Sequence, residues 1–305
     1  MKYILGIDVG TSQMKVALFD LDGRAVASAT PAYPVYQPQN GWAEQDAEDW
    51  WNAAVTGIRE VLRGIDPACV AAVGLGGQMH GLVMLDEAGA PVRRSILWCD
   101  QRTADECRQI TETVGAERLL TLTANPALTG FTASKILWVR NHEPENYKKC
   151  AHILLPKDYV RYRLTGEFAT DVSDASGMQL LDVANRCWSE EMMKALDIDR
   201  ALLAKVYESP EVTSTVTEDA ARLTGLCAGT PVVAGAGDNA AAAVGTGCIR
   251  DGKSFTTIGT SGVVYAHTSR MAADPAGRIH TFCCAVPGQW HVMGVTQAAG
   301  LSLSW

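Results

Sequence analysis

The sequence predicts an α/β fold. Short apolar runs of strand length alternate with segments of helical spacing along the 305 residues, and this alternation is typical of a sheet covered by helices. A turn rich in glycine and hydroxyl residues separates two such runs at residues 10–13, and a similar turn lies at residues 259–262. One strand, turn, strand unit near each end of the chain suggests a duplicated architecture.

The first half of the chain sets this class. Residues 70–77 form an uninterrupted apolar run of strand length, as expected for a strand covered on both faces. Residues 46–62 place apolar side chains at helical spacing and acidic side chains in the first turn, where the helix dipole favours them. The other elements expected here are strands at residues 4–7, 16–19 and 25–29 and helices at residues 101–113, 134–140 and 157–163.

The second half predicts the end of one domain and the start of another. We expect a strand at residues 232–234, a helix at residues 240–244, and strands at residues 254–258 and 263–266 around the second turn. About 50 residues follow the start of that hairpin, too few for a second domain of ordinary size. We therefore expect one domain at residues 1–245 and a second, cut short, at residues 246–305. The apolar end of the chain could promote association into a homodimer.

Composition excludes several classes of protein. Twenty-six Lys and Arg against 34 Asp and Glu give a net charge of −8, and an acidic surface repels nucleic acid. No apolar run approaches the roughly 18 residues of a membrane span, and the N-terminus lacks the apolar core of a signal peptide. The nine cysteines are odd in number and form no Cys-x-x-Cys pair, which predicts free thiols and no zinc site. We expect a cytoplasmic protein with no nucleic-acid or membrane partner.

The first turn combines a carboxylate with groups that bind anions. Asp8 ends a strand, Gly10 lets backbone N–H groups approach an anion, and the hydroxyls of Thr11 and Ser12 can donate hydrogen bonds. Divalent cations prefer carboxylate oxygens, so Asp8 would face the metal of a Mg-nucleotide. Lys15 could neutralise phosphate charge, although most lysines are simply solvated. An ordinary hairpin turn is the alternative, and the segment is not a Walker loop.

A second carboxylate, Asp238, lies at an expected junction between strand and helix. It follows Gly235-Ala236-Gly237, and functional carboxylates collect at the carboxyl ends of strands. Capping of the helix N-terminus is the alternative role.

These segments resemble known phosphate-binding proteins. The turns at residues 10–13 and 259–262 are similar to the two phosphate loops of the actin, Hsp70 and sugar-kinase superfamily. Residues 130–142, GFTASKILWVRNH, resemble the first signature of the FGGY carbohydrate kinases, which is long and specific. The resemblance runs over the whole chain and implies a ribonuclease H-like ATPase fold, with the first domain and the start of the second.

The resemblance also implies a phosphotransferase that uses ATP and Mg²⁺. It implies Asp238 as the catalytic base for a sugar hydroxyl, Asn239 as a ligand of a neighbouring hydroxyl, and Asp8 as a residue that helps to hold Mg²⁺. The implied phosphate-binding residues are Gly10, Thr11, Ser12, Lys15, Gly259, Thr260 and Ser261. The attacking hydroxyl becomes acidic late in phosphoryl transfer, so we expect a carboxylate of ordinary basicity to suffice.

The expected sugar site follows the central strand. Gln78, Met79 and His80 resemble the segment of those FGGY kinases that act on D-xylulose, whereas glycerol kinases carry charged residues there. An imidazole can donate to and accept from sugar hydroxyls, and methionine shapes the apolar side of a pocket. Without the resemblance, a single histidine after a strand is more often structural.

Trp98 and Asp100 lie in a segment that borders the sugar site in the family. The indole can lie under the carbon face of a sugar, and the carboxylate can accept hydrogen bonds from hydroxyls. Asp100 could instead cap the helix expected at residues 101–113.

The expected function is ATP-dependent phosphorylation of D-xylulose to D-xylulose 5-phosphate. The adenine-binding residues of the family lie downstream of residue 305, so we expect this chain alone to be a poor kinase. Three alternatives stay open: a kinase for ribulose, gluconate, glycerol or another polyol, an ATPase of the actin and Hsp70 type, and a non-catalytic sugar-binding fragment.

Overall fold

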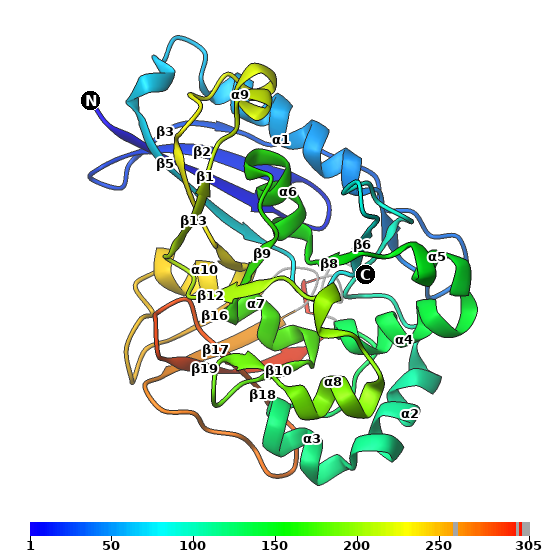
Figure 1. Ribbon diagram of the computed structural model, residues 1–305. Helices are drawn as coiled ribbons and strands as arrows, with labels where there is room; N and C mark the ends of the chain where they lie inside the picture. The colour runs from blue at the N-terminus through cyan, green and yellow to red at the C-terminus, as the bar shows by residue number, and fades with distance from the viewer. Residues whose placement is uncertain (259–261, 297–298, 301–305) are drawn as a thin grey trace.

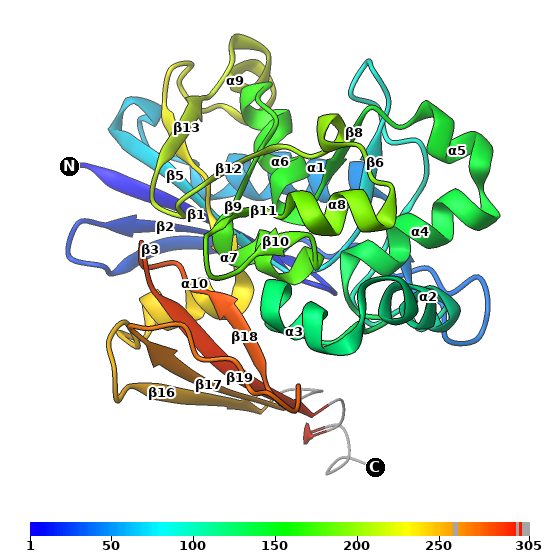
Figure 2. The same ribbon diagram turned by 60° about the horizontal axis from the view of Figure 1, so that its bottom comes forward.

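Two sheets of different size organise the protein. The structure, a computed structural model, describes residues 1–258, 262–296 and 299–300. Its seven-stranded mixed sheet and four-stranded antiparallel sheet lie on either side of helix α10 (Asp238–Gly245), as Figures 1 and 2 show. The implied phosphate ligands Gly259, Thr260 and Ser261 lie outside the described residues.

The larger sheet confirms the strands expected in the first domain. Its order is β13-β14-β5-β1-β2-β3, with β15 also paired to β5. Strands β14, β15 and β1 all run parallel to β5, so their carboxyl ends meet at one edge. The strands are β1 (Tyr3–Val9), β2 (Met14–Asp20), β3 (Ala25–Ala29), β5 (Val70–Gly77), β13 (Val212–Thr215), β14 (Pro231–Val233) and β15 (Ala236–Gly237).

Helices cover one face of this sheet. Helix α1 (Ala47–Val61) packs on β2 and β3, and α6 (Pro156–Thr165) packs on β5 and β1. Asp46 caps α1 by accepting a hydrogen bond from the backbone of Glu48, which explains why the helix begins where the acidic residues predict. A Cβ at Gly57 would lie 2.6 Å from Cγ2 of Val16, so glycine allows this close approach of helix and sheet. Helix α9 (Glu218–Thr224) packs against α1 and α6.

A second apolar core lies beside the sheet, between helices at the opposite end of the molecule from α9 (Figure 1). The expected helix at residues 134–140 extends to α4 (Thr132–His142), and the one at residues 101–113 begins later, at Ala104. Thr103 occupies its N-cap position, so the expectation that Asp100 caps this helix is wrong. This region contains α2 (Ala104–Val114), α3 (Ala116–Thr123), α5 (Pro144–Lys149), α7 (Val172–Ala175), α8 (Glu190–Leu196), η2 (Ser176–Met178), η3 (Arg200–Leu202), β6 (Val83–Leu85), β8 (His152–Leu154), β10 (Leu181–Asp182) and β11 (Cys187–Trp188).

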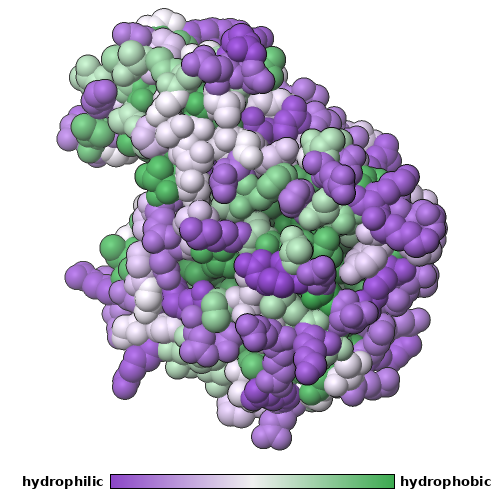
Figure 3. All heavy atoms as spheres, viewed as in Figure 1, coloured by the Kyte–Doolittle hydropathy of each residue, from purple (hydrophilic) through white to green (hydrophobic). Residues whose placement is uncertain are grey.

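Short elements connect the two cores. They are β4 (Glu44–Gln45), β7 (Ser95–Ile96), β9 (Ala169–Asp171), β12 (Lys205–Tyr207) and η1 (Pro67–Cys69). Viewed as in Figure 1, apolar residues gather in the centre of this face and polar residues surround them (Figure 3). Among the residues that the structure describes, no helix is long and apolar enough to cross a bilayer. All nine cysteines are free, as expected.

The smaller sheet has the order β16-β17-β19-β18. Strands β16 (Ser254–Ile258) and β17 (Gly262–Thr268) confirm the expected hairpin, whereas β18 (His280–Cys283) and β19 (Trp290–Thr296) were not expected. Strand β18 docks on the helical core, where Nδ2 of Asn125 donates to the carbonyl of Thr281 over 2.9 Å. The smaller sheet thereby reaches the region of the expected sugar site.

Candidate active site

The carboxyl ends of three parallel strands bring Asp8 and Asp238 together. Asp8 in β1 lies opposite Gly76 in β5, which lies opposite Ala236 in β15, and Asp238 follows β15 as the first residue of α10. Both carboxylates line one cavity of about 580 Å³. A Cβ at Gly76 would lie 3.3 Å from that of Ala241 and 4.0 Å from Oδ1 of Asp8, so this glycine keeps the floor between the carboxylates open.

Asp238 has one hydrogen-bonded oxygen and one free oxygen. The backbone N–H and the side-chain amide of Asn239 donate to its Oδ1 over 2.7 and 2.9 Å. Within the described residues its Oδ2 receives no hydrogen bond, and the side chain is exposed toward the cavity. Surrounding protein atoms reduce its hydration, and together with the negative charge of Asp8 they raise the pKa of Asp238 to about 6. Its basicity is thus higher than the ordinary value that we expected.

Asn239 therefore contacts the carboxylate that precedes it. Its amide nitrogen orients Asp238, which is a role that the sequence did not predict. The predicted contact of Asn239 with a sugar hydroxyl stays a prediction.

Asp8 is exposed and faces Lys15 across the hairpin. The two residues are paired in the register of β1 and β2, and both line the cavity. Reduced hydration raises the pKa of Asp8, and the charge of Lys15 opposes that rise. No described residue donates a hydrogen bond to the Asp8 carboxylate. Mg²⁺ is usually held by one or two carboxylates together with substrate phosphates, and this open carboxylate fits that pattern.

The turn between β1 and β2 is held rigidly at Gly10. A Cβ there would lie 2.6 Å from the carbonyl oxygen of Gln13, so the turn admits glycine alone. The hydroxyl of Tyr33 donates to the Gly10 carbonyl over 2.5 Å. The Thr11 hydroxyl accepts a hydrogen bond from Nε1 of Trp98 over 3.0 Å, while Ser12 is exposed. Of the predicted phosphate ligands in this turn, Ser12 has the freest side chain.

Gln78 supports this turn instead of facing the cavity. It is buried, and its Nε2 donates to the Gly10 carbonyl over 3.2 Å and to Oε1 of Gln45 over 2.8 Å. Trp98 likewise reaches the turn, through its bond to Thr11. The Gln78 amide is thus hydrogen-bonded within the protein, and its predicted substrate contact stays a prediction.

Met79 lies beside Gly237, the last residue of β15, and the next residue, His80, lies beside Gly177. Met79 is 4% exposed, and a Cβ at Gly237 would lie 2.7 Å from its Cγ. Nδ1 of His80 lies 3.0 Å from the carbonyl oxygen of Gly177. A carbonyl can only accept, so Nδ1 carries the proton and Nε2 of the neutral ring is an acceptor. Burial, the charge of Lys135 and the nearby His280 lower the pKa of His80 to about 3 despite that hydrogen bond.

Aromatic side chains from two distant segments of the chain surround the His80 ring. Its ring centroid lies 5.0 Å from that of Phe131, which precedes α4, and 6.0 Å from that of Phe282 in β18. The sequence did not predict a contribution from β18, because no local pattern connects these residues.

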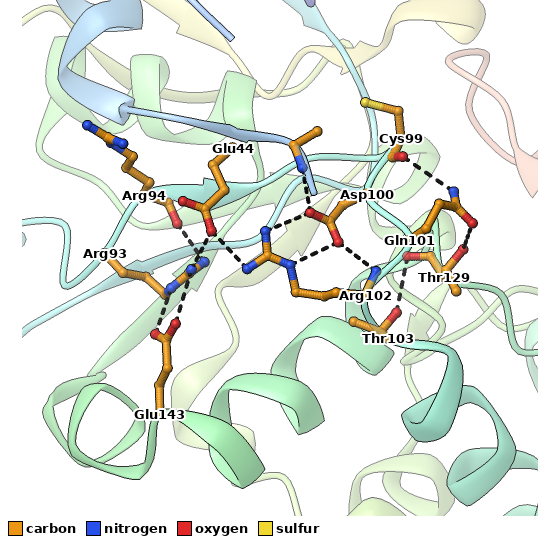
Figure 4. A network of polar contacts seen from close by, with 11 residues as sticks. Glu44, Arg93, Arg94, Cys99, Asp100, Gln101, Arg102, Thr103, Thr129 and Glu143 are labelled. Atoms are coloured by element: carbon orange, nitrogen blue, oxygen red, sulfur yellow. Dashed lines mark hydrogen bonds and ion pairs between the residues drawn. The ribbon is translucent and has the colours of Figure 1, made fainter. Parts of the chain in front are cut away.

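Asp100 is enclosed in a network of charges (Figure 4). It has no exposed surface. Its Oδ2 accepts hydrogen bonds from the backbone of Ala43 over 2.6 Å and from Nη2 of Arg102 over 2.7 Å, and its Oδ1 accepts two more from Arg102. Arg102 also pairs with Glu44, which pairs with Arg93. The Asp100 carboxylate thus joins separate segments of the chain, and its predicted sugar contact stays a prediction.

A buried charge cluster, which the sequence did not predict, lies behind Asp238. Nζ of Lys157 lies 2.7 Å from Asp158, 2.9 Å from Asp171 and 3.4 Å from Asp174, and all four side chains are fully buried. Ser173 donates to Asp171 over 2.5 Å and accepts a hydrogen bond from the backbone of Gly237 over 3.1 Å. The cluster thus anchors the residue that precedes Asp238. The only local signal is a Lys-Asp pair at the start of a helix whose buried face also carries Arg161.

Known proteins share this sequence and fold. The model of the N-terminal domain of the FGGY family of carbohydrate kinases matches residues 3–245. The xylulose kinase of Escherichia coli K12 is 42% identical over 301 residues, which cover 99% of this chain and 62% of that protein.

Solved structures agree. A xylulose kinase from Rhodospirillum rubrum superposes with a TM-score of 0.95 at 28% identity, covering 100% of this chain and 62% of the other. A gluconate kinase from Lactobacillus acidophilus gives 0.94 at 27% identity, covering 100% and 61%. This chain thus spans less than two thirds of the length of these relatives. The match to the family model, the identity to the relative from Escherichia coli and the shared actin- and Hsp70-like fold lead to one conclusion: the chain belongs to the FGGY family of carbohydrate kinases.

Proposed function

We propose that this chain supplies the sugar-binding and proton-accepting part of an ATP-dependent sugar kinase, and that the sugar is D-xylulose, phosphorylated to D-xylulose 5-phosphate. The carrying observation is that Asp238 and Asp8 line one cavity and that no described residue donates a hydrogen bond to Oδ2 of Asp238, whose carboxyl has a pKa of about 6. Relatives named xylulose kinase support the choice of sugar.

In this proposal Asp238 is the general base. Both donors of Asn239 bind Oδ1, so Oδ2 is left to accept the proton of the terminal sugar hydroxyl. A base is most effective when its pKa lies near the working pH, and a pKa of about 6 approaches that condition. The buried cluster at Lys157 and the side chain of Met79 hold the Gly237–Asp238 turn in place.

Asp8, Ser12 and Lys15 act on the phosphoryl donor. When bound, ATP supplies the phosphoryl group and Mg²⁺ shields its charge. Asp8 would bind the cation, and Lys15 would face the negative charge of the phosphates. We further propose that residues 1–245 form the sugar-binding domain and that residues 246–305 begin the nucleotide-binding domain.

The proposed sugar is a neutral polyol. Nε2 of His80 can accept a hydrogen bond from a hydroxyl, but it cannot donate one to a carboxylate. The two lysines next to this segment, Lys135 and Lys157, are fully buried and already bound to protein oxygens. These features favour a ketose over gluconate.

A substrate panel tests the proposal. The protein that carries this chain is given Mg-ATP with D-xylulose, D-ribulose, D-gluconate or glycerol, and ADP release is followed. We expect the highest kcat/KM with D-xylulose. A higher value with another sugar would contradict the assignment, and ADP release that ignores every sugar would favour an ATPase of the actin and Hsp70 type.

A further inference from the structure

Lys135 is a fully buried lysine in α4 that points at backbone oxygens. Its Nζ donates to the carbonyl of His80 over 2.8 Å and to the carbonyl of Gly130 over 2.6 Å. The hydroxyl of Thr132, one turn earlier, donates to the same His80 carbonyl over 3.1 Å. Two side chains of one helix therefore converge on a single backbone oxygen of the sugar segment.

That backbone oxygen belongs to a residue in an uncommon conformation. His80 has a φ of 69°, in the left-handed region that disfavours residues with a Cβ. Its ring is held separately, by the bond from Nδ1 to the Gly177 carbonyl. The conformation is therefore fixed at two points, the carbonyl oxygen and the imidazole.

The charge of Lys135 also acts on the imidazole. The titratable groups that influence His80 are Lys135 from α4 and His280 from β18, and both lower its pKa. Lys135 is itself influenced by Asp100, Arg102, Cys99 and Cys107, and burial lowers its pKa to about 7. A neutral amine keeps two N–H groups, enough for two carbonyls. The hydrogen bonds from Lys135 to the carbonyls of His80 and Gly130 therefore persist whether its amine is charged or neutral.

We propose that Lys135 is a positioning residue for sugar recognition: it holds the backbone of His80 in the left-handed conformation, so that Nε2 is presented to a sugar hydroxyl as an acceptor. The sugar contact rests on the proposed function, whereas the conformation and protonation of His80 do not.

The test replaces Lys135 with methionine, which keeps the side-chain length as far as Cε and removes both the donors and the charge. Nitrogen NMR follows the tautomer and the titration of His80, and calorimetry measures D-xylulose binding to the same samples. We expect His80 to titrate at a higher pH than in the wild type. We expect sugar affinity to fall by about tenfold, since the left-handed conformation costs roughly 1–2 kcal/mol once its tether is lost.

Two variants isolate the cause. Thr132→Val removes one donor to the His80 carbonyl but keeps the charge, so sugar binding should weaken by less and the titration of His80 should stay unchanged; it also serves if Lys135→Met does not fold. Lys148→Met, at an exposed lysine paired with Glu145 in α5, should change neither measurement.

The outcomes separate the two proposals. A His80 titration and tautomer unchanged in Lys135→Met, or Nε2 protonated in the wild type, would overturn the role of Lys135. Wild-type protein that binds no D-xylulose while His80 still responds to Lys135→Met would contradict the proposed function and leave the positioning role supported.

Discussion

Replacing Asp8 with asparagine should lower the pKa of Asp238. Asp8 lies in β1 and Asp238 directly follows β15, with β5 between these two strands. Two interstrand spacings therefore put the carboxylates about 10 Å apart. At that distance two unit charges repel by roughly 0.4 kcal/mol in water and about 1.7 kcal/mol at the effective dielectric of a protein surface. The substitution should therefore lower the pKa of Asp238 by about 0.3 to 1.2 from its value near 6.

Carboxyl-carbon NMR on the labelled chain measures this pKa without any turnover. The titration should be done at low ionic strength, since the Debye length of about 10 Å at 0.1 M salt matches the separation of the charges. Asp22→Asn, in the exposed turn between β2 and β3, is the matched control and should leave the titration of Asp238 in place. If the pKa of Asp238 stays constant or rises in Asp8→Asn, the two carboxylates do not lie in one site.

Three further changes test the surroundings of the site. Gly237→Ala should weaken D-xylulose binding and lower the free energy of unfolding by about 1–3 kcal/mol, because the new Cβ displaces Met79. Calorimetry measures the sugar affinity, and denaturant unfolding measures the stability. If neither value changes, Met79 does not pack against Gly237. Lys157→Met should destabilise the fold by about 3–5 kcal/mol, since it removes the cation that pairs with Asp171 and Asp174 and leaves Asp158 with Arg161 alone. A loss below about 1 kcal/mol in the free energy of unfolding, measured in urea, would contradict this role of Lys157. Folding lowers the pKa of His80 and of His291 to about 3, so below pH 6.5 the unfolded chain binds more protons and stability falls. By pH 5 each histidine should have lowered the free energy of unfolding by about 2 kcal/mol. A free energy of unfolding that stays constant between pH 7 and 5 would contradict these pKa shifts.

The sequence predicted the elements whose signals are local. Strand β5 coincides with its apolar run, and α1 begins next to Asp46, because strand burial and helix capping depend on neighbouring residues. The sequence also indicated Asp8 and Asp238 from local signals, because Asp8 lies at the end of one apolar run of strand length and Asp238 follows another.

Distant contacts account for the rest. No local pattern showed that the Asp100 carboxylate binds the backbone of Ala43, which lies 57 residues away. Nor did a local pattern show that the Gln78 amide binds the turn at Gly10, which lies 68 residues away. Lys135 stood within the segment that resembles a kinase signature, yet nothing in that segment shows that His80 is its partner.

The substitution Asp238→Asn tests the central claim most directly. The amide keeps the size of the side chain but cannot accept a proton from the sugar. In the protein that carries this chain, kcat for D-xylulose with Mg-ATP should fall by about 10²- to 10⁴-fold, with little change in sugar affinity. Turnover that stays within about twofold of the wild type would contradict a proton-accepting role for this carboxylate.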